Sequence, residues 1–184
     1  METKPKKQKA PPGWIYSATD EDDYEVGIDT NEKHSGTKCG YLKSVVTNPK
    51  PFGNLSSWFT PEDYLEKRMR MTAWVKTELT QGKAQLWLRI DGDWKTASQK
   101  PGCFDNMDDR PITGSTNWNK YELVVDIPQT TTNIVFGLML IGEGQIWLDD
   151  VSFEEVSKDV TLTGMFCIAK AKSLAPKNLN FEDE

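Results

Sequence analysis

The sequence is poor in histidine, in cysteine and in long apolar runs. His34 is the only histidine among 184 residues, and Cys39, Cys103 and Cys167 lie far apart with no Cys-x-x-Cys pair. One histidine and scattered cysteines cannot supply a zinc site, and no Gly-x-Ser-x-Gly motif marks a serine nucleophile. We expect three free thiols in a reducing compartment, a structural role for His34, and no enzyme activity. The sequence does not decide whether a carboxylate pair for glycoside cleavage is present, because that depends on the distance between two carboxyl groups in the folded protein.

Positive charge is also scarce. The chain has 22 Lys and Arg against 28 Asp and Glu, a net charge of −6. Binding of nucleic acid needs clustered basic residues, so no nucleic-acid partner is expected. The one basic cluster, within residues 4–9, lies in a Pro-containing segment and is interpreted as a solvated tail. No signal-peptide pattern is visible, and no stretch approaches the roughly 20 apolar residues of a membrane span. We therefore expect a soluble, cytoplasmic protein without a membrane partner.

What the sequence does contain is a persistent two-residue alternation of apolar side chains. It is clearest in residues 68–77 and 84–91. The same pattern, or an even apolar run, recurs at 38–46, 53–59, 121–127, 133–141 and 145–153. Gly142-Glu143-Gly144 is interpreted as a hairpin turn, and no segment has a convincing helical stripe. Many short strands without intervening helices predict an all-β fold, an antiparallel β-sandwich of the jelly-roll type.

The chain divides into three parts. Residues 1–12 are predicted to be a flexible tail, 13–156 the sandwich, and 157–184 a C-terminal extension. Residues 178–182 return to strand-like alternation. Because an unpaired terminal strand exposes its backbone groups, we expect this segment to dock on the sheet; a frayed tail is the alternative.

Several segments together carry a family resemblance. They are DYEVGID (23–29), HSGTKCGYLKS (34–44), RMRMTAWVKT (68–77), AQLWLRIDG (84–92), FDNMDDRPITGSTNW (104–118) and FGLMLIGEGQIWLDDVSFEEV (136–156). Over residues 13–156 the chain resembles a bacterial jelly-roll domain found alone or attached to AraC-type transcription regulators. That domain is galactose-binding-like and similar in fold to carbohydrate-binding modules.

The resemblance has one informative departure. Such modules usually begin with an Asn-x-x-Phe-Glu strand immediately ahead of the position of Gly13-Trp14, whereas here that sequence stands at 178–182. The resemblance implies that the C-terminal strand fills the place of the usual first strand. It does so either within its own chain or in a neighbouring molecule, so that we expect a monomer or a strand-exchanged dimer.

The strongest candidate site is a strand face. If the strands 68–77 and 84–91 are neighbours, Trp74, Lys76, Trp87, Arg89 and Asp91 lie together on the side that faces away from the core. Flat aromatic rings beside charged groups are suited to sugar recognition. The alternative is that a loop or the C-terminal segment covers both tryptophans.

Two further places carry candidate residues. In the loop 105–110, Asp108 and Arg110 either line the rim of the ligand site, or Arg110 pairs with an acidic neighbour and holds the loop in shape. Related sugar-binding modules often hold a structural calcium near Asp150, and the resemblance implies one here, with Glu182 as a second ligand. A capping or ion-paired Asp150 is the alternative.

These observations favour a non-catalytic recognition module that binds a carbohydrate or a small polyol. The rival is an intracellular protein-interaction or effector-sensing module associated with transcription regulation, with a protein partner in place of the sugar. The sequence leaves the identity of the ligand open.

Overall fold

The computed structural model describes residues 10–92 and 103–164, so most of the predicted tail and the strand predicted at 178–182 lie outside the described residues. The described elements are β1 (Ile15–Ala18), β2 (Tyr24–Asp29), β3 (Cys39–Ser44), β4 (Gly53–Phe59), η1 (Glu62–Tyr64), β5 (Arg68–Gly92), β6 (Cys103–Asp105), β7 (Ile112–Thr113), β8 (Thr116–Asp126) and β9 (Thr131–Val156). All strand pairs are antiparallel. No helix in these ranges is long and apolar enough to cross a membrane.

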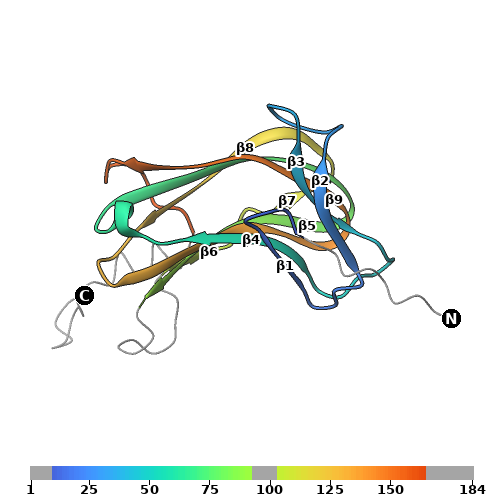
Figure 1. Cartoon of the computed structure of the whole chain (residues 1–184), viewed down its shortest axis with the longest axis horizontal. Helices are drawn as coiled ribbons and strands as arrows, with labels where there is room; N and C mark the ends of the chain where they lie inside the picture. Colours follow the sequence, from blue (N-terminus) through green and yellow to red (C-terminus); the bar gives the residue numbers. More distant parts are fainter. Residues whose placement is uncertain (1–9, 93–102, 165–184) are drawn as a thin grey trace, which may run out of the picture.

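Two long strands, β5 and β9, run through both layers of the sandwich. They pair with each other from Arg68 opposite Val156 to Gly92 opposite Thr131. The first half of β5 and the last half of β9 lie in the upper layer of Figure 1, where the strand order is β2-β3-β9-β5-β8. Their other halves share the lower layer, in the order β1-β4-β9-β5, with β6 and β7 beyond β5. The prediction of an all-β antiparallel sandwich is confirmed.

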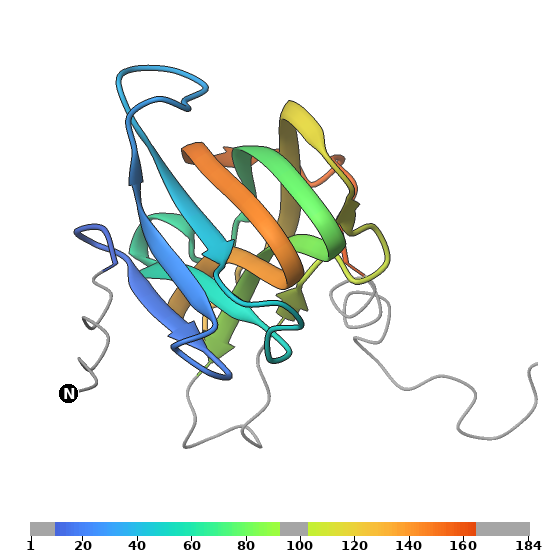
Figure 2. The same ribbon diagram turned by 90° about the vertical axis from the view of Figure 1, so that its right-hand side faces the viewer.

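Glycines allow both long strands to bend from one layer into the other. Gly82 and Gly142 pair with each other and have φ of 97° and 100°, a region that favours glycine. A Cβ on Gly82 would lie 1.9 Å from the carbonyl oxygen of Ile141. Figure 2 looks onto these bends and shows β5 and β9 side by side. The prediction of a hairpin turn at Gly142-Glu143-Gly144 is wrong, because the chain continues along β9 there.

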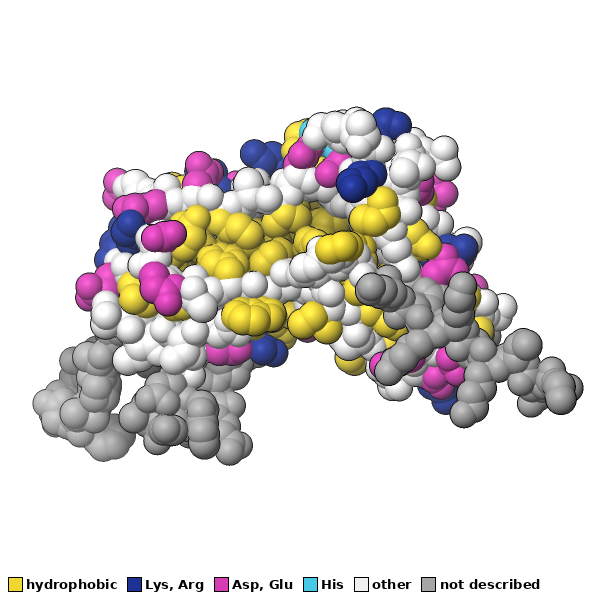
Figure 3. Space-filling model, in the orientation of Figure 1, with side chains coloured by type: hydrophobic (Ala, Val, Ile, Leu, Met, Phe, Trp, Pro, Cys, Tyr) yellow, Lys and Arg dark blue, Asp and Glu magenta, His cyan; other side chains and the backbone are white. Residues whose placement is uncertain are grey.

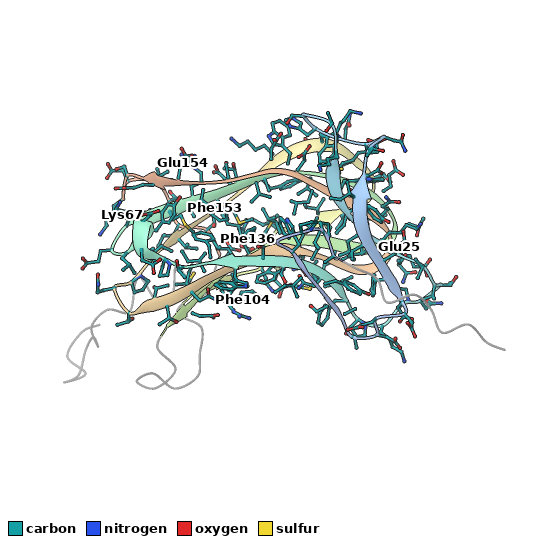
Figure 4. All side chains as sticks on the ribbon, in the orientation of Figure 1. Glu25, Lys67, Phe104, Phe136, Phe153 and Glu154 are labelled. Atoms are coloured by element: carbon teal, nitrogen blue, oxygen red, sulfur yellow. The ribbon has the colours of Figure 1, made fainter. Side chains whose placement is uncertain are left out.

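The alternation along β5 decides which side chains form the core. Residues 69, 71, 73 and 75 of the upper half and 84, 86, 88 and 90 of the lower half are at most 1% exposed. Phe136 and Phe153 of β9 lie between the layers (Figure 4). Trp74 and Trp87 occupy the opposite positions of the alternation, one in each layer, so they point away from the core in opposite directions.

The cysteines differ from the expectation of three free thiols. Cys103 is disulfide-bonded. Cys39 is free and buried, and its Sγ donates to the carbonyl oxygen of Glu32. Burial, reinforced by neighbouring carboxylates, raises the pKa of Cys39 to about 12. The cysteines therefore no longer support a reducing compartment, because that argument required free thiols throughout.

Candidate functional site

The outer face of the lower layer, which we call the lower face, carries a row of side chains across four strands. Arg89 of β5 is paired with Val135 of β9 and with Phe104 of β6, and Val135 is paired with Trp58 of β4. Directly paired residues point to the same side of a sheet. Trp58 is 55% exposed, while Arg89 and Phe104 are half-buried. The row thus offers an exposed indole, a guanidinium and a phenyl ring to the same solvent space.

The next row of the lower face, which contains Trp87, is buried and forms the floor beneath the exposed side chains. Trp87 is paired with Gly137, and a Cβ on Gly137 would lie 2.9 Å from the indole Cε2 and Nε1, so the ring extends over the glycine. The indole Nε1 donates to Asn54 Oδ1 at 2.8 Å, and the ring meets Phe104 edge-on at 6.1 Å. Trp87 is only 6% exposed. It is therefore a supporting side chain below the exposed row.

Polar groups border this aromatic surface. Arg89 donates from Nε and Nη2 to the two carboxylate oxygens of Asp91, at 2.8 and 2.9 Å. Farther along the face, Gln85 and Lys83 both donate to Asp108 Oδ1. Hydrogen bonds from Lys83 and then Gln85 hold the pKa of Asp108 below its ordinary value. Charged groups and amides with fixed partners beside aromatic rings are a usual composition of sites for polar small molecules.

The lower layer is bowed, and its outer face lies on the inside of the bow (Figure 1). Figure 3 shows the underside hollowed in the same place, and Phe104 lies on that side of the layer in Figure 4. The predicted residues Trp87, Arg89 and Asp91 share this face, as the sequence indicated. Trp58 and Phe104 were missed, because neither lies in the two segments with the clearest alternation.

The loop after β6 is held by a buried carboxylate that the sequence did not identify. Asp105, 1% exposed, accepts hydrogen bonds from Arg110 Nη2 and Thr163 Oγ1, both at 2.6 Å, and from the Met107 backbone N–H. Arg110 also donates to Asp109. These contacts agree with the interpretation that Arg110 holds the loop in shape. Ligand contact by Asp108 or Arg110 stays a prediction.

Trp74 and Lys76 lie on the outer face of the upper layer, so their predicted position beside Trp87 is wrong. The strands 68–77 and 84–91 are consecutive halves of β5, not neighbours. The His34 ring stacks on Trp74 with centroids 3.7 Å apart and planes at 14°. Lys76 Nζ is ion-paired with Glu32 at 3.0 Å and lies over the Trp147 ring. The loop between β2 and β3 therefore covers Trp74, which was the alternative interpretation.

Asp150, the predicted calcium ligand, is engaged by the same loop. Its Oδ2 lies 2.6 Å from His34 Nδ1, and its Oδ1 accepts a hydrogen bond from Ser35 Oγ at 2.9 Å. Oδ2 of Asp149 accepts the backbone N–H groups of His34 and Ser35. Within residues 10–92 and 103–164, no group of three or more His, Cys, Asp or Glu could hold a metal ion. The calcium site with Asp150 and Glu182 stays a prediction, because Glu182 lies outside these residues.

Replacing Asp150 with asparagine is expected to lower the free energy of unfolding by about 0.5 kcal/mol at neutral pH, since the carboxylate is partly exposed. Asparagine tolerates the positive φ of 48° at this position. Hydrogen bonds from His34 and then Ser35 hold the pKa of Asp150 below its usual value. The stabilisation is therefore present above about pH 4 and is lost as the pH falls through the folded-state pKa. Urea unfolding over a pH series would show the gap between the two proteins closing in acid; a constant gap would contradict this account.

A curated relative is similar over almost the whole chain. It is YbfP of Bacillus subtilis, an uncharacterized HTH-type transcriptional regulator, 40% identical over 178 residues. The match covers 96% of this chain and 59% of YbfP, so the chain spans about three fifths of the relative's length. No family model matches the chain.

The solved structures with a similar fold include a sugar-binding domain. The CBM22-1 xylan-binding domain of Xyn10C from Paenibacillus barcinonensis superimposes with a TM-score of 0.53 at 11% identity, over 82% of this chain and 90% of that one. The fold is that of a carbohydrate-binding-module jelly roll. The enzymatically active domain of tailspike protein 4 from bacteriophage CBA120 shares it as well, with a TM-score of 0.57 at 14% identity, over 79% of this chain and 20% of that chain. At sequence identities this low, the similarity is one of fold and does not extend to function.

Proposed function

We propose that this domain binds a carbohydrate or a similar polyol on the lower face and does not catalyse a reaction on it. The observation that carries the proposal is the row of Trp58, Arg89 and Phe104 above the buried floor of Trp87. An indole 55% exposed on a regular strand is costly to leave in water, and its flat face can stack on the C–H groups of a sugar ring. The Arg89–Asp91 pair is placed to hydrogen-bond hydroxyl groups beside it.

The fold supports the same proposal. The similar structure from Paenibacillus barcinonensis is a xylan-binding domain, so xylo-oligosaccharides are the natural first ligands to test. In this assignment Trp58 and Phe104 contact the sugar, Arg89 and Asp91 bind its hydroxyl groups, and Trp87 and Asn54 keep the surface in shape.

Replacing Trp58 with alanine is expected to weaken sugar binding about tenfold or more, because a stacking surface worth roughly 1.4 kcal/mol or more is removed. The free energy of unfolding should change little, since the side chain is more than half exposed. Isothermal titration calorimetry with a panel of oligosaccharides, beginning with xylohexaose, would measure the dissociation constants of both proteins.

Phe52→Ala is the matched control. Phe52 is also an exposed aromatic residue, 37% exposed, but it precedes β4 and lies outside the paired rows of the lower face. Its removal should leave sugar binding unchanged. Equal losses in both variants, or tight binding by the Trp58→Ala protein, would contradict the assignment of the ligand to the lower face.

A second candidate function is an intracellular effector-sensing or protein-interaction module. The similarity to a transcription regulator over 96% of the chain favours it. The two proposals differ in their partners. If no sugar in the panel binds and light scattering shows a mass that rises with concentration, the interaction module is preferred. A strictly constant monomer mass with saturable sugar binding favours the carbohydrate module.

A further inference from the structure

One edge of the upper layer lacks a neighbouring strand. β3 pairs with β9 only from Gln145 to Leu148. Beyond Leu148, nothing described pairs with β9 on the side away from β5; the Tyr64 hydroxyl alone donates to the Phe153 carbonyl, at 3.3 Å. The stretch from Asp149 to Phe153 therefore lies on an open edge of the sheet. An edge of this kind presents unpaired backbone groups to any extended segment that reaches it.

The space beneath this edge is apolar and incompletely filled. Phe153 contacts Phe136 and Phe59 through rings 4.9 and 4.8 Å apart, but Phe153 and Phe59 are only half-buried. Figure 3 shows hydrophobic side chains exposed between the two layers on this side. A cavity of about 330 Å³ adjoins the edge, lined by Trp14, Leu55, Leu148 and Val151, with Lys38 also contributing. Large apolar surface left open at a strand edge indicates a missing strand with inward apolar side chains.

The chain itself carries a segment with the required pattern. In Asn178-Leu179-Asn180-Phe181-Glu182, the two apolar side chains alternate with three polar ones over five residues. In an antiparallel pairing with Leu179 opposite Phe153 and Phe181 opposite Val151, both apolar side chains would face the aromatic residues between the layers, and the polar side chains would face solvent. In an antiparallel pairing Glu182 comes nearest to Asp150 and to the cavity that Lys38 lines, so the lysine can offset the acidic charge there.

The connection is long enough. Gly164 packs against Asp105 of β6, beyond β5 and thus on the opposite side of the sandwich from the open edge. The position of β6 beside β5 and the open position on the other side of β9 are three strand spacings apart, about 14 Å. Counted only from Cys167, the third cysteine, the ten residues 168–177 still span at most about 35 Å when extended, which suffices to pass around the end of the layers. Residues 165–168 are also apolar, but they follow Gly164 directly and are too few to reach.

We propose that residues 178–182 of the same chain add to the upper layer as a strand beside Asp149–Phe153, closing the apolar gap. The added strand completes the sandwich and shields Phe153 and the cavity from solvent. It requires no contribution from a second molecule.

Hydrogen exchange followed by mass spectrometry on the full chain tests the proposal. Backbone amides of residues 149–153 should be protected in the wild type. Phe181→Asp places a charge in the apolar gap and should accelerate their exchange roughly tenfold or more, with a lower melting temperature. Asn180→Asp, at the neighbouring outward position, is the control and should leave both unchanged.

Fast exchange at 149–153 in the wild type, or equal protection in wild type and Phe181→Asp, would overturn the proposal. Light scattering distinguishes the origin of the strand. A monomer mass supports docking within one chain; a dimer mass that Phe181→Asp converts to monomer would instead assign the strand to a second copy.

Discussion

The Asp105→Ala protein is expected to unfold with a free energy about 3 kcal/mol lower than that of the wild type. The carboxylate is 1% exposed and joins three parts of the chain: β6, the Arg110 guanidinium, and Thr163 of the C-terminal extension. Removing one member of a buried charge pair leaves the other without compensation, at a cost of about 3–5 kcal/mol. Arg110 is one third exposed, so the lower end of that range applies. Thermal unfolding should fall by roughly 6–12 °C for a chain of this size.

Asp109→Ala provides the matched control, because Asp109 also accepts a hydrogen bond from Arg110 but is 40% exposed. An exposed ion pair contributes about 0–1 kcal/mol, so this variant should unfold close to wild type. Calorimetry on the three proteins measures the difference. Equal melting temperatures for both variants would show that the buried hydrogen bonds of Asp105 do not hold the loop and the extension together.

Much of the fold could be predicted from the sequence, because burial and alternation have the same period in a sandwich strand. The halves of β5 and β9 were recognised as strands for this reason. The alternation does not show that the two predicted segments in each case belong to one continuous strand. Gly82 sits at the bend of β5, and a glycine between two alternating segments is typical of a hairpin turn as well as of a bend.

The same missing information explains why the predicted site combined residues that lie in different layers. Whether Trp74 and Trp87 share a face depends on whether their segments are neighbours, which is a fact about pairing and not about composition. Arg89 and Asp91 stayed beside Trp87, since all three lie in one half of β5. Trp58 was within a predicted strand, and the signal that could have identified it is its position in β4 between the half-buried Ser57 and Phe59. Asp105 could not be found, because its partner Thr163 is 58 residues away.

Trp87→Ala is expected to lower the free energy of unfolding by about 3–5 kcal/mol, the usual cost of removing a buried aromatic side chain. With an exposed fraction of 6% and a hydrogen bond to Asn54, the indole is a structural part of the face. Loss of binding in this variant would therefore be inseparable from loss of fold.

Trp87→Phe separates the two roles. The phenyl ring keeps much of the packing over Gly137 and beside Phe104, but Asn54 Oδ1 loses the indole donor, at a cost of about 1–3 kcal/mol for a buried acceptor. Sugar binding should persist, because Trp87 is buried below the exposed row of the lower face. Trp58→Ala should show the converse, with stability retained and binding lost. Chemical unfolding and calorimetric titration of the two variants would measure both quantities. If Trp87→Phe kept full stability and lost binding, the sugar would contact the indole of Trp87 itself, and the floor would have to open to admit it.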